Sequence, residues 1–191
     1  MSLRDLLDDL YAEGQAFDAT RTDREDRRRN LEPAAAEVLT LLLRAAGAAS
    51  VVEIGTSNGY SALWLAGAAR ATGGTVVSVD VVTHPDVSAN LARAGLADLV
   101  TLSTAGGGPF LAARPDHSVD LLFLDAHRPD YEDWWPDLRR VLRPGGVLAI
   151  DNVLSHPGEV SGFLGQIAAD PSFTASTVAV GKGLHVAIKD R

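Results

Sequence analysis

Short apolar runs alternate with helical stretches through most of this 191-residue chain, and this alternation limits its possible folds more than any other feature. The apolar runs lie at residues 51–54, 75–80, 99–102, 119–125 and 146–151. Helical patterns begin between or after them, near Gly59, Pro85, Gly108, Tyr131 and Gly158. Continuously apolar strands that are separated by helices form parallel sheets covered on both faces. The sequence therefore predicts a doubly wound α/β fold.

The C-terminal segment departs from this alternation. Residues 173–180 and 184–190 both have strand character, and only Gly181, Lys182 and Gly183 separate them. Because this connection is too short for a crossover helix, the two segments are expected to form a hairpin, with the last strand antiparallel. Together with the five runs above, they predict a mostly parallel, seven-stranded sheet.

The first thirty residues differ in character from the rest. We expect a short amphipathic helix, followed by a mixed-charge arm, RTDREDRRRN, at residues 21–30. Such a run is usually a solvated connector, although an arm in this position could also close over a ligand site in the domain that follows. A second helix is expected from Pro33, which suits a first helical turn, to near Gly47. The α/β domain is predicted to span residues 31–191.

Composition and charge exclude several kinds of protein. The chain has no cysteine, which excludes disulfides, thiolate metal sites and cysteine nucleophiles. Its 25 acidic and 17 basic residues give a net charge of −8, so nucleic acid is not an expected partner. No apolar run is long enough to cross a membrane, and the N-terminus lacks the pattern of a signal peptide. We therefore expect a cytoplasmic protein without membrane association.

A glycine-containing loop follows the first predicted strand. The sequence EIGTSNGYS (53–61) has a Gly-x-x-x-Gly turn, not the Gly-x-Gly-x-x-Gly pattern of dinucleotide sites. Glu53 enters this loop, and Asp80 ends the next strand, where a carboxylate can bind both hydroxyls of a ribose. Such acids would repel a pyrophosphate but suit a cationic nucleoside such as S-adenosylmethionine; the alternative is a structural turn and a capping aspartate. The candidate cofactor-binding residues of the loop are Gly55, Thr56, Ser57 and Gly59.

A second group of oxygen-bearing side chains follows two later strands. Asp125 ends one strand, and Asp151 and Asn152 end the next. If these strands are neighbours in a parallel sheet, the three side chains meet at one edge. Two carboxylates and an amide suit Mg²⁺ or another hard divalent cation such as Mn²⁺ or Ca²⁺. An aspartate that caps a helix would explain one of the three positions, but not all of them together.

Two segments and the closing hairpin carry a resemblance to a known family. The segments VVEIGTSNGYSALWLA (51–66) and LLFLDAHRPDYEDWWPDLRRVLRPGGVLAIDNVLSHPGEV (121–160) resemble the cation-dependent O-methyltransferases of the caffeoyl-CoA and catechol type. The resemblance covers roughly residues 31–191. It implies a class I methyltransferase fold of the Rossmann-like type, S-adenosylmethionine and a divalent cation as cofactors, and a small catechol-like acceptor. Homodimers are common in this family.

The resemblance also implies roles for individual residues. Those expected to contact the cofactor are Glu53, Gly55, Ser61 and Asp80, with Asp80 on the ribose. The adenine-side loop corresponds to Thr104, Ala105 and Gly106, and His127 is expected to lie against the adenine. The metal ligands correspond to Asp125, Asp151 and Asn152, with Asp125 also bordering the cofactor. The bound cation is expected to hold two adjacent oxygens of the acceptor, one of them in line with the methyl group.

The sequence departs from its relatives at one catalytic position. Family members commonly have a lysine three residues after the first metal aspartate, where this chain has Arg128. A guanidinium stays protonated and cannot act as a base, so Arg128 is expected to stabilise a phenolate or to recognise an acidic substrate group. The alternative is a solvated arginine at the start of a helix. Deprotonation would then depend on the metal alone or on His156, which follows the Asp151–Asn152 pair closely.

Two other functions remain open from the residues alone. One is a metal-independent methyltransferase of the same fold, in which Asp125 and the Asp151–Asn152 pair bind the substrate directly. The other is a nicotinamide-dependent oxidoreductase or nucleotide-binding module. The glycine spacing, the acids near the loop and the antiparallel last strand all disfavour the second alternative.

Overall fold

The computed structural model describes residues 2–23, 27–82 and 84–190. The helices are α1 (Leu3–Ala19), α2 (Pro33–Ala45), α3 (Tyr60–Thr72), α4 (Pro85–Arg93), α5 (Gly107–Ala112), α6 (Tyr131–Val141) and α7 (Pro157–Ala169). The strands are β1 (Ser50–Ile54), β2 (Thr75–Asp80), β3 (Val100–Thr104), β4 (Val119–Leu124), β5 (Leu142–Ile150), β6 (Phe173–Val178) and β7 (Leu184–Lys189). Two short 3₁₀ helices, η1 (Ala97–Leu99) and η2 (Arg128–Asp130), complete the described elements.

The seven strands form one sheet in the order β3-β2-β1-β4-β5-β7-β6. The first five strands are parallel to one another, whereas β7 runs antiparallel to both of its neighbours, β5 and β6. The expected doubly wound fold, the seven strands and the antiparallel last strand are therefore confirmed. The strand order reverses between β1 and β4, and this reversal creates the crevice in which open α/β sheets bind ligands.

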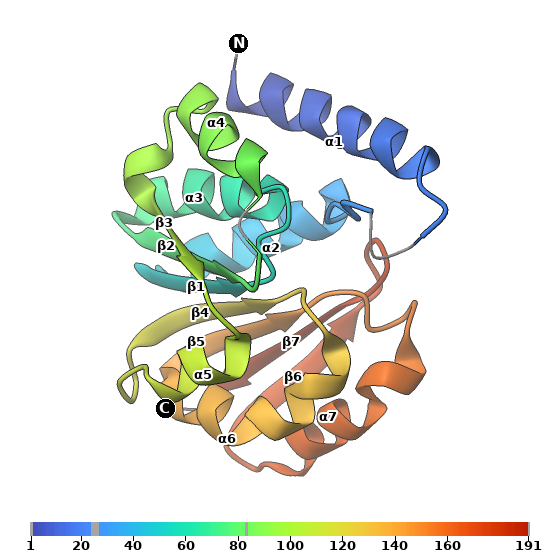
Figure 1. Cartoon of the computed structure of the whole chain (residues 1–191). Coiled ribbons are helices and arrows are strands. Elements are labelled where there is room, and N and C mark those ends of the chain that lie inside the picture. The colour runs from blue at the N-terminus through green and yellow to red at the C-terminus, as the bar shows by residue number, and fades with distance from the viewer. Residues whose placement is uncertain (1, 24–26, 83, 191) are drawn as a thin grey trace.

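Helices cover both faces of the sheet (Figure 1). Helices α1 to α4 lie on one face, and α5, α6 and α7 lie on the other. Side chains of successive residues alternate between these two layers: Phe123 packs into the first core, and Leu122 and Leu124 pack into the second. Burial on both sides is why the central strands are apolar at nearly every position.

Several strand boundaries differ from the sequence-based expectation by one or two residues, and the start of β5 differs by four. Residues 97–99 form η1, so the third strand begins at Val100 rather than at residue 99. The fifth strand begins at Leu142 rather than at residue 146, because Leu142 pairs with Val119 across an irregularity in the register. The Pro144-Gly145 pair in this stretch resembles a turn locally, and only pairing with β4 makes it part of a strand.

The N-terminal helix is longer than the short helix predicted. Helix α1 has 17 residues and begins with a capping box between Ser2 and Asp5. Its Leu6, Leu7 and Leu10 are buried in the same core as α2 and α3. The predicted arm (residues 21–30) includes residues 24–26, which lie outside the described residues, while residues 28–30 form hydrogen bonds with α1. No helix in the described ranges is long and apolar enough to span a membrane.

Candidate functional site

The loops after β1 and β4 meet at the reversal of strand order. Gly55, with a φ of +110°, lies so close to the second loop that a Cβ atom would be 2.1 Å from the carbonyl oxygen of Asp125. The strand ladders extend to this point, since the amide of Gly55 donates to Val79 (2.8 Å) and that of Asp125 donates to Ile54 (3.0 Å). A glycine is required here by both the backbone conformation and the close approach.

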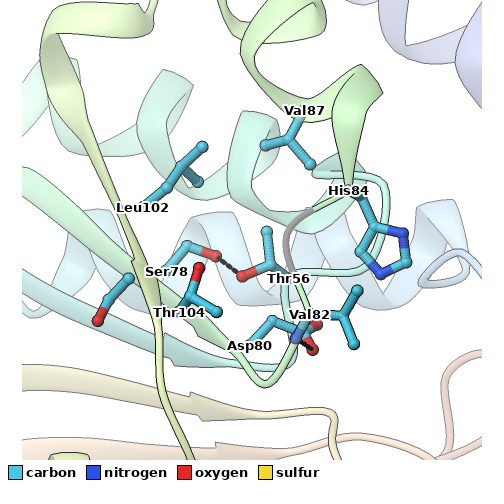
Figure 2. A pocket seen from close by; sticks show the side chains of 9 residues that line it. Thr56, Ser78, Asp80, Val82, His84, Val87, Leu102 and Thr104 are labelled. Atoms are coloured by element: carbon cyan, nitrogen blue, oxygen red, sulfur yellow. Dashed lines mark hydrogen bonds between the residues drawn. The ribbon is translucent and has the colours of Figure 1, made fainter.

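A hollow opens beside this loop (Figure 2). The sticks in Figure 2 show an oxygen-bearing floor formed by Thr56, Ser78 and Asp80, with Val87 and Leu102 beyond it. Thr104, at the end of β3, lines the same hollow. A carboxylate beside apolar walls can bind the hydroxyls of a ribose and the face of a purine, so the hollow suits a nucleoside.

Asp80 is held in place by the loop that it faces. Its two carboxylate oxygens accept hydrogen bonds from the amides of Ser57 (2.9 Å) and Val82 (3.2 Å). A carboxylate can accept about four hydrogen bonds, so these contacts orient Asp80 and leave it able to bind further donors. Ser57 has a φ of +46°, a left-handed conformation that serine rarely adopts, at the point where its amide meets Asp80.

Glu53 lies beneath the loop, with no exposed surface. Ser78 Oγ donates a hydrogen bond to its Oε2, and the Thr56 and Ser78 hydroxyls are 2.7 Å apart. Its Oε1 has no hydrogen-bond partner among the described residues. Burial raises the pKa of Glu53 to about 8, although the nearby Ser61 and Ser78 hydroxyls oppose the shift. Glu53 is therefore a buried acid under the cofactor loop, and the contact with a cofactor predicted for it stays a prediction.

The raised pKa of Glu53 predicts a pH-dependent free energy of unfolding. Between pH 4.5 and 8 the folded protein holds a proton on Glu53 that the unfolded chain releases, so this contribution is full below pH 4.5 and is lost as the pH rises to 8. We expect Glu53→Gln to reduce the fall in unfolding free energy between pH 5.5 and 8 by on the order of 1–3 kcal/mol. Urea titrations at both pH values measure it. The exposed Glu13→Gln is the control, and an unchanged difference in Glu53→Gln would contradict the assignment.

The second predicted group of side chains, Asp125, Asp151 and Asn152, lies at the neighbouring ends of β4 and β5. The amide nitrogen Nδ2 of Asn152 donates to Asp125 Oδ1 over 3.0 Å. Asn152 has a φ of +67°, and the adjacent Asp151 is buried, with its Oδ1 lacking a hydrogen-bond partner in the described part of the chain. Burial and the Asp125 carboxylate raise the pKa of Asp151 to about 7, and burial also raises that of Asp125.

These donors fit a hard divalent cation. A buried carboxylate (Asp151) and a partly buried one (Asp125) close together are costly unless a proton or a cation compensates their charge, and Asp151 Oδ1 is available as a ligand. The third donor is the Asn152 amide, so the set contains two acids rather than three. In agreement with this, the described ranges contain no cluster of three His, Cys, Asp or Glu side chains suited to a metal. Carboxylate and amide oxygens are the donors that Mg²⁺, Mn²⁺ and Ca²⁺ prefer.

Arg128 does not have the solvated position considered for it. Its side chain is buried, and its Nε donates to Glu159 Oε2 of α7 over 2.7 Å. The guanidinium therefore joins the loop after β4 to α7, and one of its edges is engaged by a carboxylate. The neighbouring Ala126 amide donates to the buried Tyr131 hydroxyl (2.7 Å), which fixes the same loop from α6.

The two histidines that were predicted to belong to the site, His127 and His156, lie in different surroundings. The His127 side chain is 73% exposed, and its Nδ1 lies 3.2 Å from the carboxylate of Asp130, which is not one of the predicted site residues. His156 precedes α7, and its Nδ1 lies 2.8 Å from Ser155 Oγ.

The loop after β3 is joined to the site through the amide of Ala105, which donates to the Asp80 carbonyl (2.9 Å). Gly106 follows it, directly before α5.

Several residues of this region were not identified from the sequence. They are Ser78, Val82, His84, Val87, Leu102 and Ser103, which line the hollow. Ser78 precedes Asp80 by two residues and so lies on the same face of β2, a signal that period-two reading could have found. His84 and Val87 come from the start of α4, and no spacing rule relates them to the loop after β1.

Comparisons with known proteins agree with this site. Residues 52–153, slightly more than half of the chain, match a family described as a methyltransferase domain. The chain is 32% identical over 178 residues to a protein of Mycobacteroides abscessus named as an O-methyltransferase, covering 83% of this chain and 80% of that protein. It is also 37% identical over 130 residues to a catechol O-methyltransferase of Mycobacterium tuberculosis, covering 63% of this chain and 55% of that protein.

A solved structure supports the same conclusion. The O-methyltransferase TomG of Streptomyces achromogenes, determined in complex with S-adenosylmethionine, superposes with a TM-score of 0.76 at 27% identity. The match covers 85% of this chain and 82% of TomG. The sheet order, the glycine loop above a buried glutamate and the Asp80 hollow are thus found in a chain that is similar to such enzymes along most of its length. The chain belongs to the S-adenosylmethionine-dependent O-methyltransferases.

Proposed function

We propose that this enzyme methylates one hydroxyl of a small aromatic acceptor with two adjacent hydroxyls, with the help of a divalent cation. The observation that carries the proposal is the group Asp125, Asp151 and Asn152, in which Asp151 Oδ1 is buried without a hydrogen-bond partner in the described ranges. The similarity to a catechol O-methyltransferase supports the acceptor class.

The residues of the site divide into two roles. Asp80 and the 55–59 loop would hold the nucleoside, with Asp80 oriented toward its hydroxyls by the Ser57 and Val82 amides. Asp125, Asp151 and Asn152 would hold the cation, which when bound lowers the pKa of an acceptor hydroxyl and fixes its position. The close approach of Gly55 to Asp125 brings these two parts of the site together.

Proton removal is assigned to a side chain other than Arg128. The Arg128 guanidinium cannot accept a proton, and its Nε is bound to Glu159. His156 remains the proposed acceptor of the proton, since it lies on the loop after β5 and a neutral imidazole is a suitable base near neutral pH. Arg128 and Glu159 would instead fix the loop after β4 against α7.

A methylation assay tests the proposed function. The purified enzyme is given S-adenosylmethionine with 4-methylcatechol or with 4-methylphenol, in Mg²⁺ or in EDTA. We expect methylation of the catechol in Mg²⁺, a loss of at least about 100-fold in EDTA that added Mg²⁺ reverses, and little turnover of the phenol. Methylation of both acceptors in EDTA would instead support the metal-independent alternative.

A further inference from the structure

The end of the charged arm is fixed to helix α1. The Asp18 carboxylate, near the C-terminal end of α1, accepts hydrogen bonds from the amides of Arg28 (2.7 Å) and Arg29 (2.9 Å). Asn30 Nδ2 donates to the Leu10 carbonyl of the same helix over 3.2 Å. These bonds give this part of the arm a defined path, which a solvated connector would lack.

The main chain of Arg28 also contacts the cofactor loop. Its carbonyl accepts a hydrogen bond from Ser57 Oγ over 3.2 Å. The amide of the same serine donates to the Asp80 carboxylate (2.9 Å), and the φ of this serine is +46°. A left-handed serine is unfavourable unless its surroundings hold it in place. Ser57 is held from two sides, so the arm helps to direct its amide toward Asp80.

The Arg28 side chain contacts a further element, helix α4. Its Nη2 lies 3.0 Å from Oδ2 of Asp86 in the first turn of α4, and its Cζ lies 4.5 Å from the centre of the Phe17 ring of α1. The side chain is only 23% exposed. A guanidinium held between a carboxylate and an aromatic face keeps one orientation. Arg28 therefore joins α1 and the cofactor loop to the start of α4.

Both segments that are joined in this way form walls of the hollow. Thr56 lines it from the loop after β1, and His84 and Val87 line it from the start of α4. Figure 2 shows these three side chains beside the hollow. A direct hydrogen bond between the two walls, from Asn90 Nδ2 to the Asn58 carbonyl, is long at 3.5 Å. The polar contacts through the arm are therefore the closer ones.

We propose that Arg28 is a positioning residue for the cofactor, which holds the loop after β1 and the start of α4 on either side of the bound nucleoside. The inference rests on the part of the proposed function that places the nucleoside in this hollow. Walls that are fixed before binding lose less conformational entropy when the ligand arrives, so the affinity is higher. Arg28 therefore acts on the affinity for S-adenosylmethionine and not on the chemical step.

The test measures cofactor affinity in the full chain without turnover. S-adenosylmethionine is titrated calorimetrically into the wild type, Arg28→Gln, Asp86→Asn and the double variant. We expect Asp86→Asn to raise Kd about threefold, because the ion pair is partly exposed. Arg28→Gln also loses the contact with the Phe17 ring and should raise Kd about tenfold. The double variant should match Arg28→Gln, since the ion pair is already lost, and Arg28→Lys should restore part of the affinity.

Charge-matched controls and kinetics separate positioning from a general structural effect. Arg44→Gln on α2 and Asp98→Asn in η1 change exposed side chains that do not line the hollow, and should leave Kd within about twofold. With 4-methylcatechol in Mg²⁺, Arg28→Gln should raise KM for S-adenosylmethionine about tenfold, while kcat and KM for the catechol stay within about twofold. Thermal denaturation verifies that each variant is folded at the temperature of the assay.

The possible failures have different signatures. An unchanged Kd in Arg28→Gln would overturn the proposal, as would losses that add in the double variant or a fall in kcat without a change in KM for S-adenosylmethionine. If Arg28→Gln does not fold, Asp86→Asn decides, because it leaves the main-chain bonds of the arm intact. Asp80→Asn tests the placement of the nucleoside, and an unchanged Kd there would refute both that placement and the proposal. Failure of the wild type to methylate 4-methylcatechol would refute the proposed acceptor, while the titrations would still test Arg28.

Discussion

Replacing Asp151 with asparagine is expected to lower kcat/KM for a catechol by at least about 100-fold while the enzyme remains folded. The substitution keeps the shape of the side chain but removes the negative charge from the oxygen that lacks a partner in the described ranges. Folding should not suffer, because burial and repulsion by the Asp125 carboxylate both raise the pKa of Asp151, and the change removes the charge on which both act. The variant should therefore have an equal or higher Tm without cation, and should bind S-adenosylmethionine as before.

The controls for this prediction use the same chemical change elsewhere. Asp98→Asn alters an exposed aspartate in η1 and should leave turnover unchanged. Turnover is measured by methyl transfer at saturating Mg²⁺, folding by thermal denaturation and cofactor binding by calorimetry. Wild-type turnover in Asp151→Asn would rule out a catalytic cation at this position, whereas a lower Tm together with lost cofactor binding would indicate a structural role.

Replacing Gly55 with alanine is expected to lower the free energy of unfolding by about 3 kcal/mol or more, which corresponds to a Tm roughly 6–12 °C lower. Two effects add. The φ of +110° is unfavourable for any residue with a Cβ, and the new atom would lie 2.1 Å from the Asp125 carbonyl oxygen. Relief of this clash requires the loops after β1 and β4 to separate. We therefore expect cofactor binding to weaken even in the fraction that stays folded.

Two other glycines separate the conformational effect from the steric one. Gly73→Ala has a positive φ (+70°) but no atom within 4 Å of the new Cβ, so it should cost only about 1 kcal/mol. Gly165→Ala, in the interior of α7 with open space around it, should stabilise the protein by about 0.5–1 kcal/mol. Urea denaturation compares the three variants. A loss for Gly55→Ala no greater than that for Gly73→Ala would contradict the steric argument.

The sheet could be predicted from the sequence because its central strands are apolar on both faces. β4 shows this most clearly: Leu121, Leu122, Phe123 and Leu124 are all buried, with successive side chains in opposite cores. The antiparallel hairpin followed from a connection too short for a helix. The start of β5 at Leu142 did not follow, since the pairing of Leu142 with Val119 depends on a neighbouring strand and not on the local sequence.

The candidate site was predictable to the extent that its residues end consecutive parallel strands. Asp125 and Asn152 are separated by a whole helix in the sequence, yet their side chains are 3.0 Å apart because β4 and β5 are neighbours. The partners of side chains that lie away from the strand ends, such as Arg128, could not be predicted in this way. Arg128 is bound by Glu159 of α7, and nothing in the local sequence indicates this partner.

The sequence by itself determined the succession of strands and helices along the chain and the positions of the acids that end the strands. Those properties depend on local patterns: apolar periodicity, glycine spacing and connection length. Only the tertiary structure decided which charges are left without a partner. It engaged Arg128 with Glu159, and it held the main chain of Arg28 beside the cofactor loop through Asp18 and Ser57. Such pairing depends on the approach of segments distant in sequence, and the free energy of a charge depends on that approach and on burial.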